Sequence, residues 1–199
     1  MPPLSSVMLL IGSVVAVSLA AFAVPGLRAA LILHPHSVRR RGQVHRLLTA
    51  GWIHADVGHL AFNMLTLWFF ANDVERTLGT TRLLILYVSA VVVAFIPSTI
   101  RHADNPRYTS LGASGAVAAV LFSAVLLRPT LKLSLMFLPI PIPGPLYAIG
   151  YVAYSAWRSW RSRDGINHDA HFSGAIYGAL LTFAFEPTRV QRALAQLLP

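Results

Sequence analysis

Residues 83–100 read LLILYVSAVVVAFIPSTI, a run without a charged side chain that approaches the length of about 20 residues needed to cross a bilayer. Hydropathy places five similar runs around it, at about residues 7–24, 57–72, 112–127, 137–157 and 170–185. Because backbone groups in hydrocarbon must find hydrogen bonds within their own segment, each run predicts a helix. The pattern therefore predicts an all-α, multi-pass membrane protein with a bundle of six transmembrane helices.

The composition agrees with a single membrane-embedded domain spanning residues 1–199. Of the 199 residues, 55% are hydrophobic and 12% charged, whereas soluble domains carry roughly 25% charged residues. The mean hydropathy is +0.61. Cysteine is absent, which excludes disulfides, thiolate metal sites and a cysteine nucleophile.

The net charge of +9 comes from arginines that lie between the apolar runs. This placement predicts contact with lipid headgroups and makes the bilayer, not nucleic acid, the expected partner. Ten of the 16 basic residues lie in the first, third and fifth loops: Arg28, Arg39, Arg40, Arg41, Arg46, Arg101, Arg107, Arg158, Arg161 and Arg163. By the positive-inside tendency, these loops would face the cytoplasm.

Two connections have unusual sequences. Residues 25–56 mix arginines with apolar side chains, which predicts a structured first loop rather than a flexible linker. Residues 138–145 read LPIPIPGP and cannot form regular helix, because each proline lacks an N–H donor. The aromatic residues that follow at helical spacing, Tyr147, Tyr151, Tyr154 and Trp157, favour an interfacial or packing stripe over substrate contact.

Polar groups inside membrane helices are costly and are functional candidates. They gather in three clusters: residues 54–63, 112–115 and 170–174. Each cluster opens a span of even number, and these spans all run in one direction. The three clusters can therefore meet at one depth, near one face of the bilayer.

Ser114 and His171 are the candidate nucleophile and general base. Small residues usually indicate close helix packing, and Gly174 and Gly178 have the spacing for it. If the fourth and sixth helices pack through Gly115 and Gly174, the same contact brings Ser114 and His171 together. Both lie in the first turn of a helix, where the dipole favours neutral histidine and a forming oxyanion.

The remaining polar residues suggest supporting roles. His59 and Asn63 lie four positions apart on one helical face and could form an oxyanion hole with the backbone N–H of Ser114. His54 is expected to fasten the first loop. Asp169 is expected to cap its helix together with Asn167, which leaves a two-residue catalytic unit. A zinc site is disfavoured because no His-Glu-x-x-His helix is present.

These motifs, in this order, resemble the rhomboid intramembrane serine proteases over about residues 44–185. The matching residues are His54, His59 and Asn63, then Glu75 in VERTLG, Gly112 and Ser114 in GASG, and His171, Gly174 and Gly178 in AHFSGAIYG. The resemblance implies a Ser114–His171 dyad, an oxyanion hole at His59, Asn63 and Ser114, and no cofactor. It further implies transmembrane protein substrates that enter between the second and fifth spans. By this resemblance the active-site face would be the outer face of a bacterial cytoplasmic membrane, in conflict with the arginine distribution.

The chain departs from the family pattern at two positions. The Trp-Arg pair that many members carry in the first loop is His45-Arg46 here, so only Arg46 matches. Some members place a tyrosine four residues after the serine, against the histidine, where this chain has Ala118. Two other classes of function are alternatives: an inactive rhomboid-like protein that binds or escorts membrane partners, and a small transporter. The presence of both dyad residues argues against the first, and polar residues near one face argue against the second.

Overall fold

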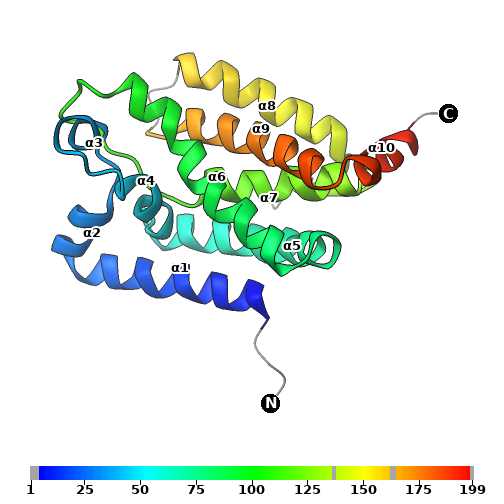
Figure 1. The fold of residues 1–199 in the computed structure, drawn as a ribbon, viewed down its shortest axis with the longest axis horizontal. Helices are drawn as coiled ribbons and strands as arrows, with labels where there is room; N and C mark the ends of the chain where they lie inside the picture. Colours follow the sequence, from blue (N-terminus) through cyan, green and yellow to red (C-terminus); the bar gives the residue numbers. More distant parts are fainter. Residues whose placement is uncertain (1–4, 136–137, 162–164, 198–199) are drawn as a thin grey trace.

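The computed structural model describes residues 5–135, 138–161 and 165–197, and it is predominantly helical (Figure 1). The longer helices are α1 (Ser6–Ala23), α5 (Val57–Leu78), α6 (Thr80–Arg101), α7 (Ser114–Leu127), α8 (Gly144–Arg161) and α9 (His168–Phe185). Shorter helices are α2 (Pro25–Leu31), α3 (Pro35–Arg41), α4 (Arg46–Thr49), the 3-10 turn η1 (Ala50–Trp52) and α10 (Pro187–Ala195). Two strands, β1 (Lys132–Leu135) and β2 (Leu138–Pro143), precede α8.

Helix α7 forms the centre of the bundle. Nearly all of its residues are buried, which suits a helix that is apolar on every side. It packs against α5, α6 and α9, while α1 and α8 lie at opposite edges of the molecule (Figure 1). The core is therefore built around the helix that begins with Ser114.

Capping residues and glycines define where the helices near the active site begin and end. The Asp56 carboxylate accepts a hydrogen bond from the backbone N–H of His59 at 2.8 Å and caps α5. Gly79, at φ +82°, separates α5 from α6. Gly112 has φ +114°, a conformation that side chains disfavour, so the chain cannot be helical there and α7 begins at Ser114.

Each of the six predicted spans overlaps a helix, but the lengths differ. Helix α5 continues through polar residues to Leu78, beyond the predicted end at residue 72, because hydropathy detects only the apolar part of a helix. Within the described part of the chain, α1 and α6 are long and apolar enough to cross a membrane. The apolar helix α7 is shorter. Six crossings therefore remain a prediction.

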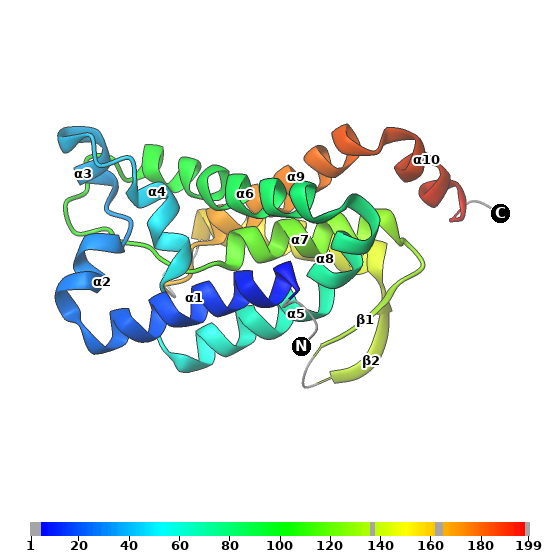
Figure 2. The ribbon, with the colours of Figure 1, turned by 60° about the horizontal axis from the view of Figure 1, so that its bottom comes forward.

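The predicted start of the fifth span is wrong. Residues 138–143 form β2, which pairs antiparallel with β1 in a register that places Leu133 opposite Ile142, and α8 begins only at Gly144. The alternate prolines of β2 lack N–H donors and suit a two-stranded ribbon in which each strand has a free edge. The hairpin projects away from the helices (Figure 2). Phe137, where this span was expected to begin, and Arg163 lie outside the described residues.

The first loop, residues 25–56, consists largely of α2, α3, α4 and η1. Arg46 ties these pieces together: its guanidinium donates to the carbonyl oxygens of Ala29 at 2.8 Å and Ile32 at 2.7 Å and to the Gln43 side chain at 2.7 Å. Leu33 forms a β-bridge with Ser110, which attaches the first loop to the chain that leads into α7. The loop thus supports the segment that carries Ser114.

Candidate active site

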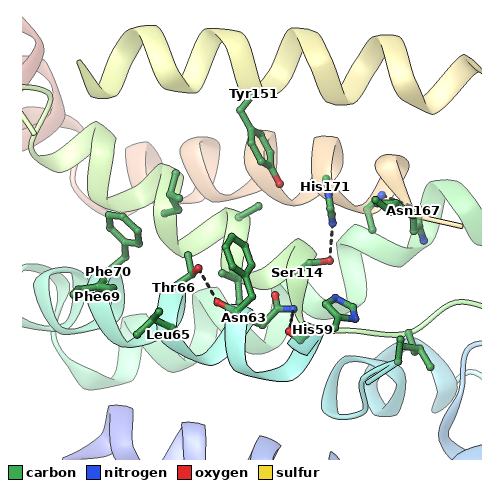
Figure 3. A pocket seen from close by; sticks show the side chains of 18 of the residues that line it. His59, Asn63, Leu65, Thr66, Phe69, Phe70, Ser114, Tyr151, Asn167 and His171 are labelled. Carbon is green, nitrogen blue, oxygen red and sulfur yellow. Dashed lines mark hydrogen bonds between the residues drawn. The ribbon is translucent and has the colours of Figure 1, made fainter. Parts of the chain in front are cut away.

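A cavity of about 1130 Å³ extends between α5, α7, α8 and α9 (Figure 3). Ser114 and His171 line it together with His59 and Asn63. Its wall continues along α5 toward the hairpin through apolar and aromatic residues, among them Phe62, Leu65, Phe69, Phe70, Leu121, Leu133, Tyr147 and Tyr151. The cavity therefore joins the polar cluster to an apolar channel beside α5 and α8.

Ser114 and His171 are in direct contact. The Nε2 atom of His171 lies 2.7 Å from the Oγ atom of Ser114, a normal hydrogen-bond distance (Figure 3). Ser114 is the first residue of α7, and His171 lies in the first turn of α9. The close packing of α7 and α9 brings together two residues that are 57 positions apart in the sequence.

The start of α7 presents hydrogen-bond donors to the cavity. The first N–H groups of a helix have no partner within the helix. Its N-cap residue is Ala113, which makes no side-chain cap hydrogen bond. Free N–H groups at a helix start attract negative charge, so this end of α7 is suited to an oxyanion next to Ser114.

His59 and Asn63 both face the cavity from α5, as their spacing predicted (Figure 3). Asn63 is 2% exposed, and its Nδ2 donates to the His59 carbonyl oxygen at 2.9 Å. An amide nitrogen has two N–H donors, so this bond uses one of them. The His59 ring lies against Gly112, where an added Cβ would lie 2.7 Å from His59 Cε1. Gly112 thus makes room for His59.

His54 joins three parts of the chain. Its Nε2 accepts from the backbone N–H of Ala113 at 3.3 Å, and its Nδ1 lies 3.0 Å from Ser18 Oγ on α1. Because the Ser18 hydroxyl donates to the Trp52 carbonyl at 2.9 Å, Nδ1 must be the donor in the bond to Ser18. Burial, reinforced by His59 and opposed by Asp56, lowers the pKa of His54 to about 4. His54 is therefore neutral. It was expected to fasten the first loop, and it also binds the backbone of Ala113, the residue before Ser114.

The start of α9 is held by a polar network. Asn167 caps the helix, accepting from the N–H of Ala170 at 3.0 Å, and its amide donates to Ser98 at 3.0 Å and Ser110 at 2.9 Å. The expectation that Asp169 shares this capping is wrong. Asp169 forms an ion pair with Arg101 at 2.9 Å and a hydrogen bond with Ser159, because it points toward α6 and α8.

Two rings next to His171 were not identified from the sequence. The Tyr151 ring stacks on it at a centroid distance of 6.2 Å and an interplanar angle of 25°, and His168 meets it edge-on at 5.8 Å and 75°. The sequence places Tyr151 in an interfacial or packing stripe and gives it no role at the dyad. Its spacing from Tyr147 on one face of α8 was the available signal, but nothing in the sequence indicated that this face meets α9.

The other predicted supporting residues do not line the cavity. Gly174 and Gly178 are at the contact between α9 and α7, where an added Cβ would overlap the backbone of Gly115 and Ala119, respectively. Glu75 is at the far end of α5 and accepts hydrogen bonds from Ser6 and from Thr80, the latter at 2.8 Å. Among the residues described, no group of three or more His, Asp or Glu side chains is arranged to hold a metal ion.

Comparison with known proteins identifies the family to which this domain is similar. The rhomboid domain family matches residues 41–187 of this chain. RHOMBOID-like protein 12, mitochondrial, of Arabidopsis thaliana is 31% identical over 156 residues, which cover 71% of this chain and 46% of the relative. Presenilin-associated rhomboid-like protein, mitochondrial, of Homo sapiens is 31% identical over 137 residues, covering 66% of this chain and 35% of the relative.

A bacterial relative matches a shorter segment. Rhomboid protease GluP of Bacillus subtilis (strain 168) is 40% identical over 86 residues, covering 43% of this chain and 16% of the relative. The chain thus spans less than half the length of these curated relatives. Two of the three are mitochondrial, which does not favour the expected bacterial cytoplasmic membrane, whereas a membrane location follows from the domain itself.

Proposed function

We propose that this chain, which belongs to the rhomboid family, is an intramembrane serine endopeptidase with Ser114 as nucleophile and His171 as general base. The observation that carries this proposal is the 2.7 Å contact between His171 Nε2 and Ser114 Oγ inside a cavity. A hydroxyl is a weak nucleophile at neutral pH, and a neutral imidazole within hydrogen-bond reach activates it. The rhomboid domain makes the chain a membrane protein.

The reaction follows from this geometry. His171 Nε2 accepts the Ser114 proton as Oγ attacks the peptide carbonyl, and the imidazolium then donates that proton to the leaving amine. The tetrahedral oxyanion is stabilised by N–H groups at the start of α7 and by the side chains of His59 and Asn63. Water then attacks the ester on Ser114, and His171 again accepts and returns a proton.

The cavity suits a transmembrane segment as substrate. Its apolar wall runs along α5 beside Tyr147 and Tyr151 of α8, so a substrate helix can lie between these two helices with its end at the dyad. A helical peptide has its carbonyls in internal hydrogen bonds. The segment must unwind locally before Ser114 can attack, which favours cleavage sites with small or helix-breaking residues.

The test is covalent labelling with a fluorophosphonate probe in detergent, together with cleavage of a transmembrane substrate. Wild type should be labelled, and Ser114→Ala and His171→Ala should lose both labelling and cleavage while remaining folded. Ser89→Ala is the control, because the Ser89 hydroxyl donates to the Ile85 carbonyl of the same helix, α6, and does not line the cavity. Labelling of Ser114→Ala at the wild-type rate would contradict the proposal.

The alternative is a binding or escort protein without catalytic activity. It predicts that wild type binds transmembrane partners but is neither labelled by the probe nor able to cleave them. The Ser114–His171 hydrogen bond favours the protease, because a purely binding protein has no need for an activated hydroxyl.

A further inference from the structure

Tyr151 projects from the middle of α8 toward His171 (Figure 3). Its ring centroid lies 6.2 Å from that of His171 with the planes inclined by 25°, within the range in which aromatic rings attract one another. The edge of His168 approaches the same imidazole at 5.8 Å. The general base is therefore held by neighbouring rings as well as by its bond to Ser114.

The Tyr151 ring is itself fixed on several sides. It meets Phe122 of α7 at a centroid distance of 5.5 Å and Tyr147 of α8 at 6.0 Å. It also packs on a buried apolar cluster that includes Ala118 and Ala175. A ring with contacts to α7, α8 and α9 can act as a firm support for the imidazole.

Helix α7 has no aromatic ring one turn after Ser114, where it has Ala118. Ala118 lines the same cavity as Tyr151 and His171 and is buried. A methyl group at that position cannot reach across to stack on an imidazole. The ring that stacks on His171 comes instead from α8, which also lines the cavity.

Helix α8 buries fewer residues against the rest of the protein than α7 and α9 do. Among its residues only Gly144 and Ser155 are buried, and it lies at the edge of the bundle (Figure 1). Its end is attached through Ser159, which bonds to both Arg101 and Asp169. A shift of α8 would carry the Tyr151 ring with it.

We infer that Tyr151 is a positioning residue, which keeps the His171 imidazole oriented toward Ser114 and makes this orientation depend on α8. The inference rests on the proposed function. Without the ring, the histidine side chain can populate other staggered rotamers, and only a fraction of molecules has the dyad aligned. An aromatic contact of ordinary strength corresponds to a loss of about 2- to 10-fold in rate.

The experiment compares Tyr151→Leu and Tyr151→Met with Tyr151→Phe. The labelling rate of Ser114 by a small fluorophosphonate is measured from pH 5.5 to 9, together with kcat and KM for a transmembrane substrate, on monodisperse protein in detergent. The probe needs no docked helix, so its rate reports on the dyad alone. Trp157→Leu is the control, because it removes an aromatic ring from α8 outside the cavity.

Tyr151→Leu and Tyr151→Met should slow labelling and kcat by the same factor with KM nearly unchanged, while Tyr151→Phe and Trp157→Leu keep the wild-type rate. Using two apolar replacements keeps the test informative if one of them does not fold. Unchanged labelling with a raised KM would make Tyr151 a substrate contact and overturn the inference. An equal loss in Tyr151→Phe would also overturn it, because that variant keeps the ring and lacks only the hydroxyl group. If wild type itself is not labelled, it is the proposed function that fails.

Discussion

Gly174 of α9 lies directly against the backbone of Gly115 of α7, with no space for a side chain between them. Gly178 meets Ala119 in the same way one turn later. Ser114 precedes Gly115, and His171 lies one turn before Gly174. This approach of two backbones therefore sets the distance between the nucleophile and the base.

Gly174→Ala should push α7 and α9 apart, because the added methyl group meets backbone atoms that cannot rotate away. Overpacking of this kind costs about 1–3 kcal/mol, and the Ser114–His171 contact should lengthen as well. The expected result is a lower Tm and strongly reduced fluorophosphonate labelling. Gly150→Ala is the control, since an added Cβ there meets nothing within 4 Å. Wild-type Tm and labelling in Gly174→Ala would show that the helices can separate without consequence.

Gly112→Ala should reduce activity more than stability alone explains. The substitution strains a residue at φ +114° and places a Cβ 2.7 Å from His59, which must move away from the cavity. Gly79→Ala is a matched control, because it has φ +82° and open space around it. Both variants should lower Tm, but only Gly112→Ala should lower kcat per folded molecule. Equal kcat in the two variants would show that His59 does not contribute to the oxyanion hole.

Asn63→Ala should lower kcat by about 10²- to 10³-fold, the usual effect of removing one oxyanion donor, and leave KM nearly unchanged. The loss in stability should stay within about 1–2 kcal/mol, because one hydrogen bond to the His59 carbonyl is removed. Asn63→Asp should be no better, since a carboxylate repels the oxyanion.

Asn72→Ala is the control for Asn63, because Asn72 makes the same bond to a carbonyl of its own helix, Trp68 O at 2.8 Å, outside the cavity. It should lose similar stability and keep normal turnover. If Asn63→Ala melts earlier but turns over normally, Asn63 is a structural residue and the oxyanion hole consists of other groups.

His54 should make the protein less stable in acid. Its folded-state pKa is lowered to about 4 from an ordinary value of 6.5, so the unfolded chain takes up a proton first as the pH falls. The contribution of neutral His54 to the free energy of unfolding is then fully present above pH 6.5. It is lost between pH 6.5 and 4 and amounts to about 3 kcal/mol at most. Tm measured in steps from pH 7.5 to 4.5 should fall less steeply in His54→Gln than in wild type. Parallel curves would show that other groups cause the acid sensitivity.

Six spans place both termini on the same side of the membrane. With a cytoplasmic N-terminus, the C-terminus is therefore also expected in the cytoplasm, opposite the active site. The excess of arginines on the active-site face predicts the opposite orientation. Several of these arginines, however, bind groups within the protein: Arg28 and Arg46 donate to backbone carbonyls of the first loop, and Arg101 forms an ion pair with Asp169. A fluorescent reporter fused after Pro199 should fold and fluoresce in the cytoplasm of a bacterial host. Activity of an exported phosphatase reporter at the same position would reverse the orientation.

The linear sequence was sufficient for the features that depend on local pattern. Apolar length located the longer helices, and glycine spacing indicated how the fourth and sixth predicted spans meet. That contact also made the pairing of Ser114 and His171 predictable, because each of the two lies within one helical turn of a packing glycine. The prolines correctly excluded helix at residues 138–143, but Gly144 and Pro145, also expected to lie outside a helix, open α8, because proline is tolerated in the first turn of a helix. The boundaries were less accurate, because polar residues such as those ending α5 continue a helix that hydropathy no longer detects.

Only the tertiary structure decided which side chains surround the dyad. Tyr151 lies 20 positions before His171 on another helix, and its contact depends on the rotation and tilt of α8, which hydropathy does not encode. The pairing of Asp169 with Arg101 and the bond from Ala113 to His54 depend in the same way on how separate segments are arranged. Local patterns constrain each helix one at a time, whereas the environment of the base arises where four helices and the first loop meet.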